Sequence, residues 1–74
     1  MLEMYLAEYG EWCGHKVVEG ETRVSPIDYY VARLVRGEEV DLVEMEEMFE
    51  FFYSEETAKE EVSKLLKEWP GKIW

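Results

Sequence analysis

The feature that most constrains the fold of this chain is a strong helix start at Ser25-Pro26. A serine at the N-cap accepts a hydrogen bond from a first-turn amide, and proline is tolerated at the first helical position. Asp28 follows at the position of a capping-box acid. Gly37 stands where a helix would stop, because glycine adopts the left-handed conformation common after the last turn. The sequence therefore predicts a helix over residues 26–36.

Two further helices follow from the same kind of signal. Asp41 and Ser54 are both N-cap residue types, and each precedes a stretch with apolar residues at helical spacing. Pro70 ends the last stretch, because a proline disfavours helical geometry in the residue before it. We expect helices over residues 42–53 and 55–69.

The sequence determines the secondary structure of the N-terminal third less clearly. Residues 2–13 carry apolar side chains at helical spacing, but Gly10 weakens a helix by up to about 1 kcal/mol, so helix and strand both remain open. Residues 15–24 read HKVVEGETRV, in which two short β-branched runs flank Gly20. This pattern is typical of a β-hairpin, which we expect over residues 15–25.

Together these elements predict a mostly α, small α+β fold. It would be one compact domain over residues 1–74, with three to four helices and a short hairpin near residues 15–25. A domain of this size buries only about 60% of the surface of its unfolded chain. Hydrophobic residues nevertheless make up 47% of the sequence, which is too much for a disordered acidic segment.

The charge of the chain limits its partners. It has 8 Lys and Arg against 18 Asp and Glu, a net charge of −10. This balance argues against direct nucleic-acid binding and against an anionic membrane surface, and it favours a basic protein as partner. Sixteen of the 18 acids are Glu, and Asn and Gln are absent, a pattern typical of hyperthermophiles. One cysteine and the lack of a long apolar run lead us to expect a cytoplasmic protein.

The acidic segment DLVEMEEMFEFFYSEE, residues 41–56, holds a cluster of aromatic residues. On a helix, most apolar residues of this segment share one face and are expected to form core. These residues are Leu42, Met45, Met48, Phe49, Phe52 and Tyr53. Val43 and Phe51 lie off that face, which indicates a second packing surface, either within the chain or against another copy.

The acids of the same helix allow another interpretation. Asp41, Glu44, Glu46, Glu47 and Glu50 are five carboxylates in a stretch of ten residues, nine residue steps from first to last. At 1.5 Å per residue they span about 13.5 Å, so their spacing is near that of phosphates along one nucleic-acid strand. A nucleic-acid mimic that occupies a basic groove is therefore an alternative to ordinary solvated helix surface.

Three other groups of residues bear on function. Tyr29, Arg33 and Arg36 form a small aromatic and basic face that we expect to pair with the acidic helix. Trp74 is either docked on the core or exposed as an anchor. Cys13 and His15 are zinc-ligand types, but structural zinc needs four ligands. One Cys and one His also do not establish a catalytic site. We therefore predict no catalytic, cofactor or metal residues.

The sequence favours a non-enzymatic interaction protein that forms a homodimer through helix 42–53. Its expected contact residues are Phe51, Glu44, Glu47, Glu50, Val43 and Trp74, with Tyr29, Arg33 and Arg36 as a secondary surface. The alternative is the nucleic-acid mimic, which would bind a DNA- or RNA-handling protein through the Glu-rich C-terminal half.

Overall fold

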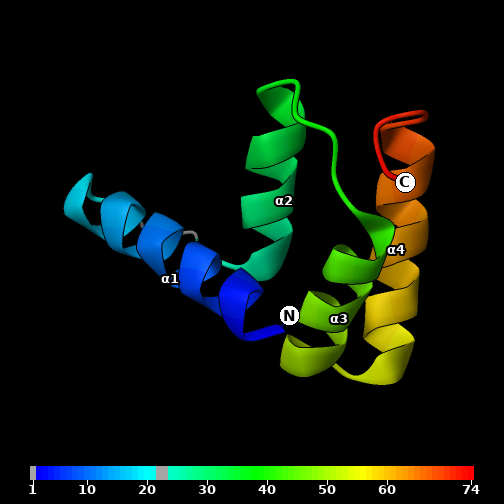
Figure 1. Cartoon of the computed structure of the whole chain (residues 1–74), viewed down its shortest axis with the longest axis horizontal. Coiled ribbons are helices and arrows are strands. Elements are labelled where there is room, and N and C mark those ends of the chain that lie inside the picture. The colour runs from blue at the N-terminus through cyan, green and yellow to red at the C-terminus, as the bar shows by residue number, and fades with distance from the viewer. Residues whose placement is uncertain (1, 22–23) are drawn as a thin grey trace.

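The computed structural model describes residues 2–21 and 24–74, and it shows four helices in this part of the chain (Figure 1). They are α1 (Leu2–Val18), α2 (Pro26–Val35), α3 (Leu42–Phe52) and α4 (Glu55–Glu68). The prediction of a mostly helical fold is confirmed. The last three helices correspond to the predicted ones, and each ends one residue earlier.

The N-cap residues act as their types suggest. Ser25 Oγ accepts a hydrogen bond from the Asp28 amide at 3.2 Å, and Ser54 Oγ accepts one from the Thr57 amide at 3.3 Å. Asp41 Oδ1 accepts from two amides at the start of α3, at 2.8 and 3.3 Å. These bonds satisfy first-turn amides that have no partner within a helix.

The predicted hairpin over residues 15–25 is wrong. Its first β-branched run lies inside α1, which continues through Gly14 to Val18. Gly20, with a φ of 87°, ends this helix in a Schellman motif. The Glu21 amide donates to the Lys16 carbonyl at 2.8 Å, and the Gly20 amide donates to the Val17 carbonyl at 3.0 Å. Residues 22 and 23 of the expected second strand lie outside the described residues.

Glycine substitutions test this assignment. We expect Gly14→Ala to raise the free energy of unfolding by roughly 0.5–1 kcal/mol, because alanine favours helix and a Cβ at Gly14 meets no atom within 4 Å. Gly20→Ala should lower it by about 1 kcal/mol, because an L-residue is strained at positive φ. Urea denaturation followed by circular dichroism measures both. Equal effects at the two positions would contradict the helix end at Gly20.

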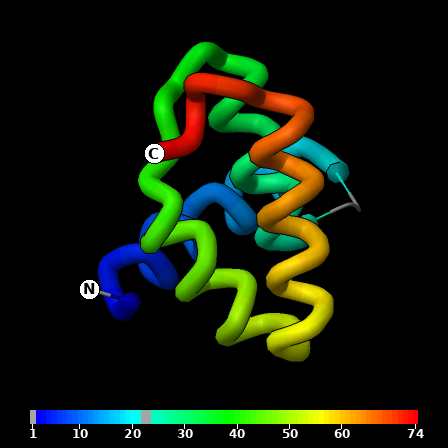
Figure 2. Tube along the Cα trace, turned by 90° about the vertical axis from the view of Figure 1, so that its right-hand side faces the viewer, coloured from blue at the N-terminus to red at the C-terminus, as the bar shows by residue number. Residues whose placement is uncertain are grey.

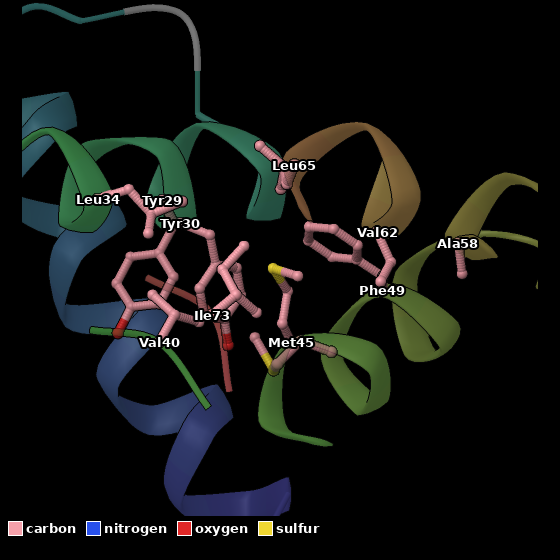
Figure 3. Packing of buried hydrophobic residues seen from close by; sticks show 11 residues of the cluster. Tyr29, Tyr30, Leu34, Val40, Met45, Phe49, Ala58, Val62, Leu65 and Ile73 are labelled. Carbon is pink, nitrogen blue, oxygen red and sulfur yellow. The ribbon is translucent and has the colours of Figure 1, made fainter. Parts of the chain in front are cut away.

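One hydrophobic core, drawn in Figure 3, lies between α2, α3 and α4, and partly buried side chains of α1 pack against it. Its buried side chains come from α2, α3, α4, the segment between α2 and α3, and the end of the chain. They are Tyr29, Tyr30, Leu34, Val40, Met45, Met48, Phe49, Ala58, Val62, Leu65 and Ile73. Phe52 was expected in the core, but it lies at the edge of the core and is 42% exposed.

Helices α3 and α4 form a pair, and α2 packs against α3. Helices α3 and α4 lie side by side and run in opposite directions (Figure 2), while α1 packs against both α2 and α3. The C-terminal end of α1 points away from α3 and α4 in Figure 1. No helix in the described ranges has both the length and the apolar character that crossing a membrane requires.

Residues after α4 return to the start of α3. A turn at Pro70-Gly71, with a φ of 78° at the glycine, reverses the chain, and Ile73 then forms a parallel β-bridge with Val40. The Trp74 amide donates to the Val40 carbonyl at 3.0 Å. The backbone of segment 70–74 is therefore docked against the residues that precede α3.

Candidate functional site

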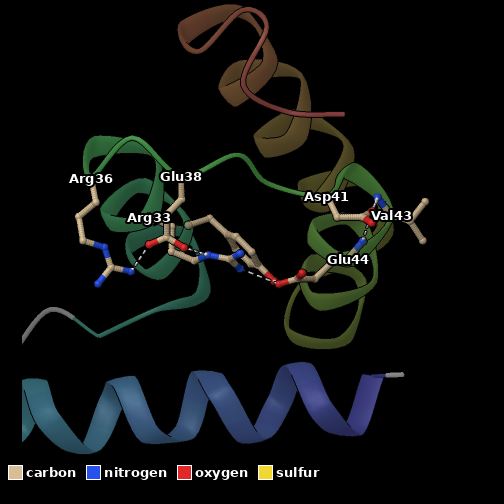
Figure 4. Close-up of polar contacts among 7 residues, drawn as sticks. Arg33, Arg36, Glu38, Asp41, Val43 and Glu44 are labelled. Carbon is tan, nitrogen blue, oxygen red and sulfur yellow. Dashed lines mark hydrogen bonds and ion pairs between the residues drawn. The ribbon is translucent and has the colours of Figure 1, made fainter.

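The carboxylate of Glu44 lies at the centre of a buried polar cluster between α2 and α3 (Figure 4). Glu44 is only 8% exposed. The Tyr30 hydroxyl and Arg33 Nη1 both donate to Glu44 Oε2, each at 2.8 Å. These bonds compensate for removing the carboxylate from water, and they connect the two helices.

The cluster continues outward through a second carboxylate. Arg33 Nε donates to Glu38 Oε1 at 3.3 Å, and Arg36 Nη2 lies 2.7 Å from Glu38 Oε2. The Arg33 guanidinium also lies 5.5 Å from the ring centroids of Tyr29 and Tyr30, within range of a cation–π contact. The Arg33 guanidinium therefore has two carboxylate partners, and the Glu44 carboxylate has two side-chain donors.

The ionisation of the buried groups reflects these contacts. Burial raises the pKa of Tyr30, and its hydrogen bond to Glu44 adds to the effect because an ionised phenol would face a carboxylate. For Arg33, burial alone lowers the pKa, but the hydrogen bond and charge of Glu44 outweigh it, so the pKa is raised. The Tyr30 hydroxyl therefore keeps its proton and donates a hydrogen bond to Glu44.

In this geometry some of the predicted contact residues are buried and others are exposed. Glu44 is turned inward and Tyr29 is buried, so neither presents an outer surface. Tyr29 lies edge-on against Tyr9 and Trp12 of α1, with ring centroids 5.6 and 5.4 Å away. The expected aromatic face of α2 is therefore covered by α1. Arg36 stays exposed beside Glu38.

Phe51 does present an outer surface. It is 58% exposed, and its ring lies edge-on to Phe52 with the centroids 5.1 Å apart. Phe52 in turn contacts Tyr9 of α1, at 5.3 Å between ring centroids. We call Phe51 and Phe52 the phenylalanine patch. Val43, Glu47 and Glu50 of the predicted contact set are also exposed on α3.

Trp74 is docked by its backbone and exposed by its side chain, which answers both expectations in part. Its main-chain oxygen accepts from the Leu42 amide, while 71% of the residue is exposed. An exposed tryptophan therefore lies next to the first turn of α3.

Cys13 and His15 do not form a joint site. They are two residues apart on α1, so their side chains point to different sides of the helix. Burial, followed by a hydrogen bond with Cys13, raises the pKa of Tyr9. Within residues 2–21 and 24–74, no group of three or more His, Cys, Asp or Glu is arranged to hold a metal ion.

A groove between α3 and α4 was missed by the sequence analysis. It has a volume of about 380 Å³. Its lining residues are Glu46, Glu50, Ala58, Lys59, Val62, Ser63 and Leu66. The sequence shows the apolar stripe of α4, but a groove also requires knowing which face of α3 lies opposite, and that is a property of packing.

Comparison with protein-family models, curated proteins and solved structures finds no match for this chain. Two surface features of α3 remain as candidates for function. The phenylalanine patch lies on the flank that meets α1, and the groove lies on the flank that meets α4.

Proposed function

We propose that this chain is a non-enzymatic interaction module that forms a homodimer through the exposed face of α3. The observation that carries this proposal is the phenylalanine patch, in which two adjacent phenylalanine residues are 58% and 42% exposed. Single exposed apolar residues are common on monomers, whereas adjacent exposed aromatic rings are typical of contact surfaces. Aromatic residues also contribute much of the binding energy at interfaces.

The patch alone is too small for a stable dimer. A standard interface buries about 800 Å² on each partner, which is roughly a sixth of the 5066 Å² surface of this chain. The contact must therefore extend along α3 towards Val43, two turns before Phe51, with Glu47 and Glu50 at its margin. A two-fold axis near Phe51 would place the same patch of both copies in contact.

Charge gives the dimer a characteristic salt dependence. Each copy carries a net charge of −10, so two copies repel each other at low ionic strength. Salt screens this repulsion, and the dimer should tighten as salt is added. Binding of an acidic mimic to a basic partner would weaken instead, so the direction of the salt effect separates the two functions.

The proposal predicts that Phe51→Ser weakens the dimer by about 30-fold or more, the loss of an interface residue that contributes about 2 kcal/mol. Serine leaves the net charge unchanged, so added repulsion cannot explain the loss. Molar mass from light scattering after size exclusion, over a range of protein and salt concentrations, measures the effect.

Val35→Ser is the matched control, because Val35 is an exposed apolar residue on α2, away from the patch. It should leave the dimer constant within about two-fold. A native chain that is monomeric at high salt and high concentration would contradict the proposal, and so would equal losses in the two variants.

A further inference from the structure

The groove between α3 and α4 has an apolar floor in the form of a straight stripe. Ala58, Val62 and Leu66 follow one another at intervals of four residues along α4. At 1.5 Å per residue the stripe extends about 12 Å, or somewhat more than two helical turns. Ala58 and Val62 are buried beneath the surface, while Leu66 is exposed at the end of the stripe.

The α3 wall of the groove is acidic. Glu46 and Glu50 lie one turn apart on it, and neither takes part in the ion pairs found among residues 2–21 and 24–74. The lysine on the opposite wall is already paired, because Lys59 Nζ lies 3.4 Å from Glu55 Oε1. The helices that form the groove carry nine carboxylates against three lysines.

We propose that this groove binds an amphipathic basic helix of another protein. An apolar stripe with a spacing of four residues matches the stripe of a second helix laid along it, because residues four apart share one helix face. Two bases four residues apart on that helix would meet Glu46 and Glu50. The groove does not include the phenylalanine patch, and it shares only Glu50 with the proposed dimer contact.

The chemistry favours a basic helix over an acidic or neutral one. An acidic helix would place further carboxylates beside Glu46 and Glu50, in a chain that already carries a charge of −10. A neutral helix would leave these two carboxylates to lose part of their hydration without a counterion. A lysine or arginine at each position replaces that hydration with an ion pair.

The test uses a synthetic helical peptide of about 14 residues, four turns of helix, built from leucine on one face and lysine on the other. Its binding to the full chain is measured by fluorescence anisotropy at low salt. Two control peptides are an isomer with the leucines scattered around the helix and a version with glutamate for lysine. We expect binding of the first peptide at least about ten-fold tighter than that of either control.

Paired variants locate the site. Glu46→Gln/Glu50→Gln and Leu66→Ser should each weaken peptide binding by about ten-fold. Glu60→Gln/Glu68→Gln removes the same charge from exposed positions of α4 outside the groove lining, and should change binding by less than about three-fold. Circular dichroism of each variant establishes that it is folded.

Two outcomes would overturn the proposal. Equal losses in the two double variants would mean that the peptide responds only to net charge. Loss of peptide binding in Phe51→Ser would place the peptide on the phenylalanine patch. A dimer that fails to form, with peptide binding intact, contradicts only the proposed self-association.

Discussion

We expect Phe49→Ala to lower the free energy of unfolding by about 3–5 kcal/mol, the usual range for removing a buried aromatic ring. Phe49 is 0% exposed and lies edge-on to Tyr30 and Tyr53, with ring centroids 5.7 and 5.9 Å away. A domain of 74 residues has a total stability of roughly 4–11 kcal/mol. The variant should therefore be close to unfolding at room temperature.

Phe51→Ala is the matched control, the same substitution two residues further along the same helix. Phe51 is mostly exposed, so the monomer should lose no more than about 0.5 kcal/mol. Urea denaturation of both variants, at concentrations where the chain is monomeric, gives the comparison. Similar losses at the two positions would mean that α3 is rotated about its axis relative to the structure.

The second large effect on stability is expected at the buried ion pair between Arg33 and Glu44. Arg33→Met should lower the free energy of unfolding by about 3 kcal/mol, because it leaves the Glu44 carboxylate buried with Tyr30 as its remaining side-chain donor. This loss is at the low end of the range for breaking a buried pair, because the Glu44 side chain keeps 11% exposure. Thermal and urea unfolding at neutral pH measure the loss.

Two further variants test the cause. Arg36→Met removes the same charge from an exposed pair with Glu38 and should cost less than about 1 kcal/mol. In Arg33→Met/Glu44→Leu the unpaired carboxylate is also removed, so most of the lost stability should return. An Arg33→Met loss no larger than that of Arg36→Met would show that the buried pair stabilises the fold no more than the exposed pair does.

Local signals in the sequence were sufficient for α2, α3 and α4. Ser25, Asp41 and Ser54 cap these helices through side-chain bonds to residues two or three positions away, so the evidence lies within one turn. The signal at Gly20 is ambiguous, because a glycine shortly after two valines is typical both of a hairpin turn and of a helix end. The backbone bonds to Lys16 and Val17 decide between them.

The candidate site was less predictable, because it depends on which helix covers which face. The position of Phe51 on the surface followed from helical spacing alone. The burial of Tyr29 did not, since it results from α1, whose structure the sequence left open. Glu44 likewise turned inward because α2 supplies Tyr30 and Arg33 opposite it. Such pairings between separate helices have no signal in a single segment.

The β-bridge between Val40 and Ile73 has a consequence for the order of folding. Most contacts in a helical domain are local in sequence and form early, whereas this bridge closes a loop that contains all of α3 and α4. Loop closure of that length costs entropy before any bond is gained. The bridge should therefore form after the α3–α4 pair. By the same reasoning it should open first. Exchange of the Trp74 amide, and of the Val40 amide that donates to the Lys72 carbonyl, should therefore report a local opening that precedes global unfolding.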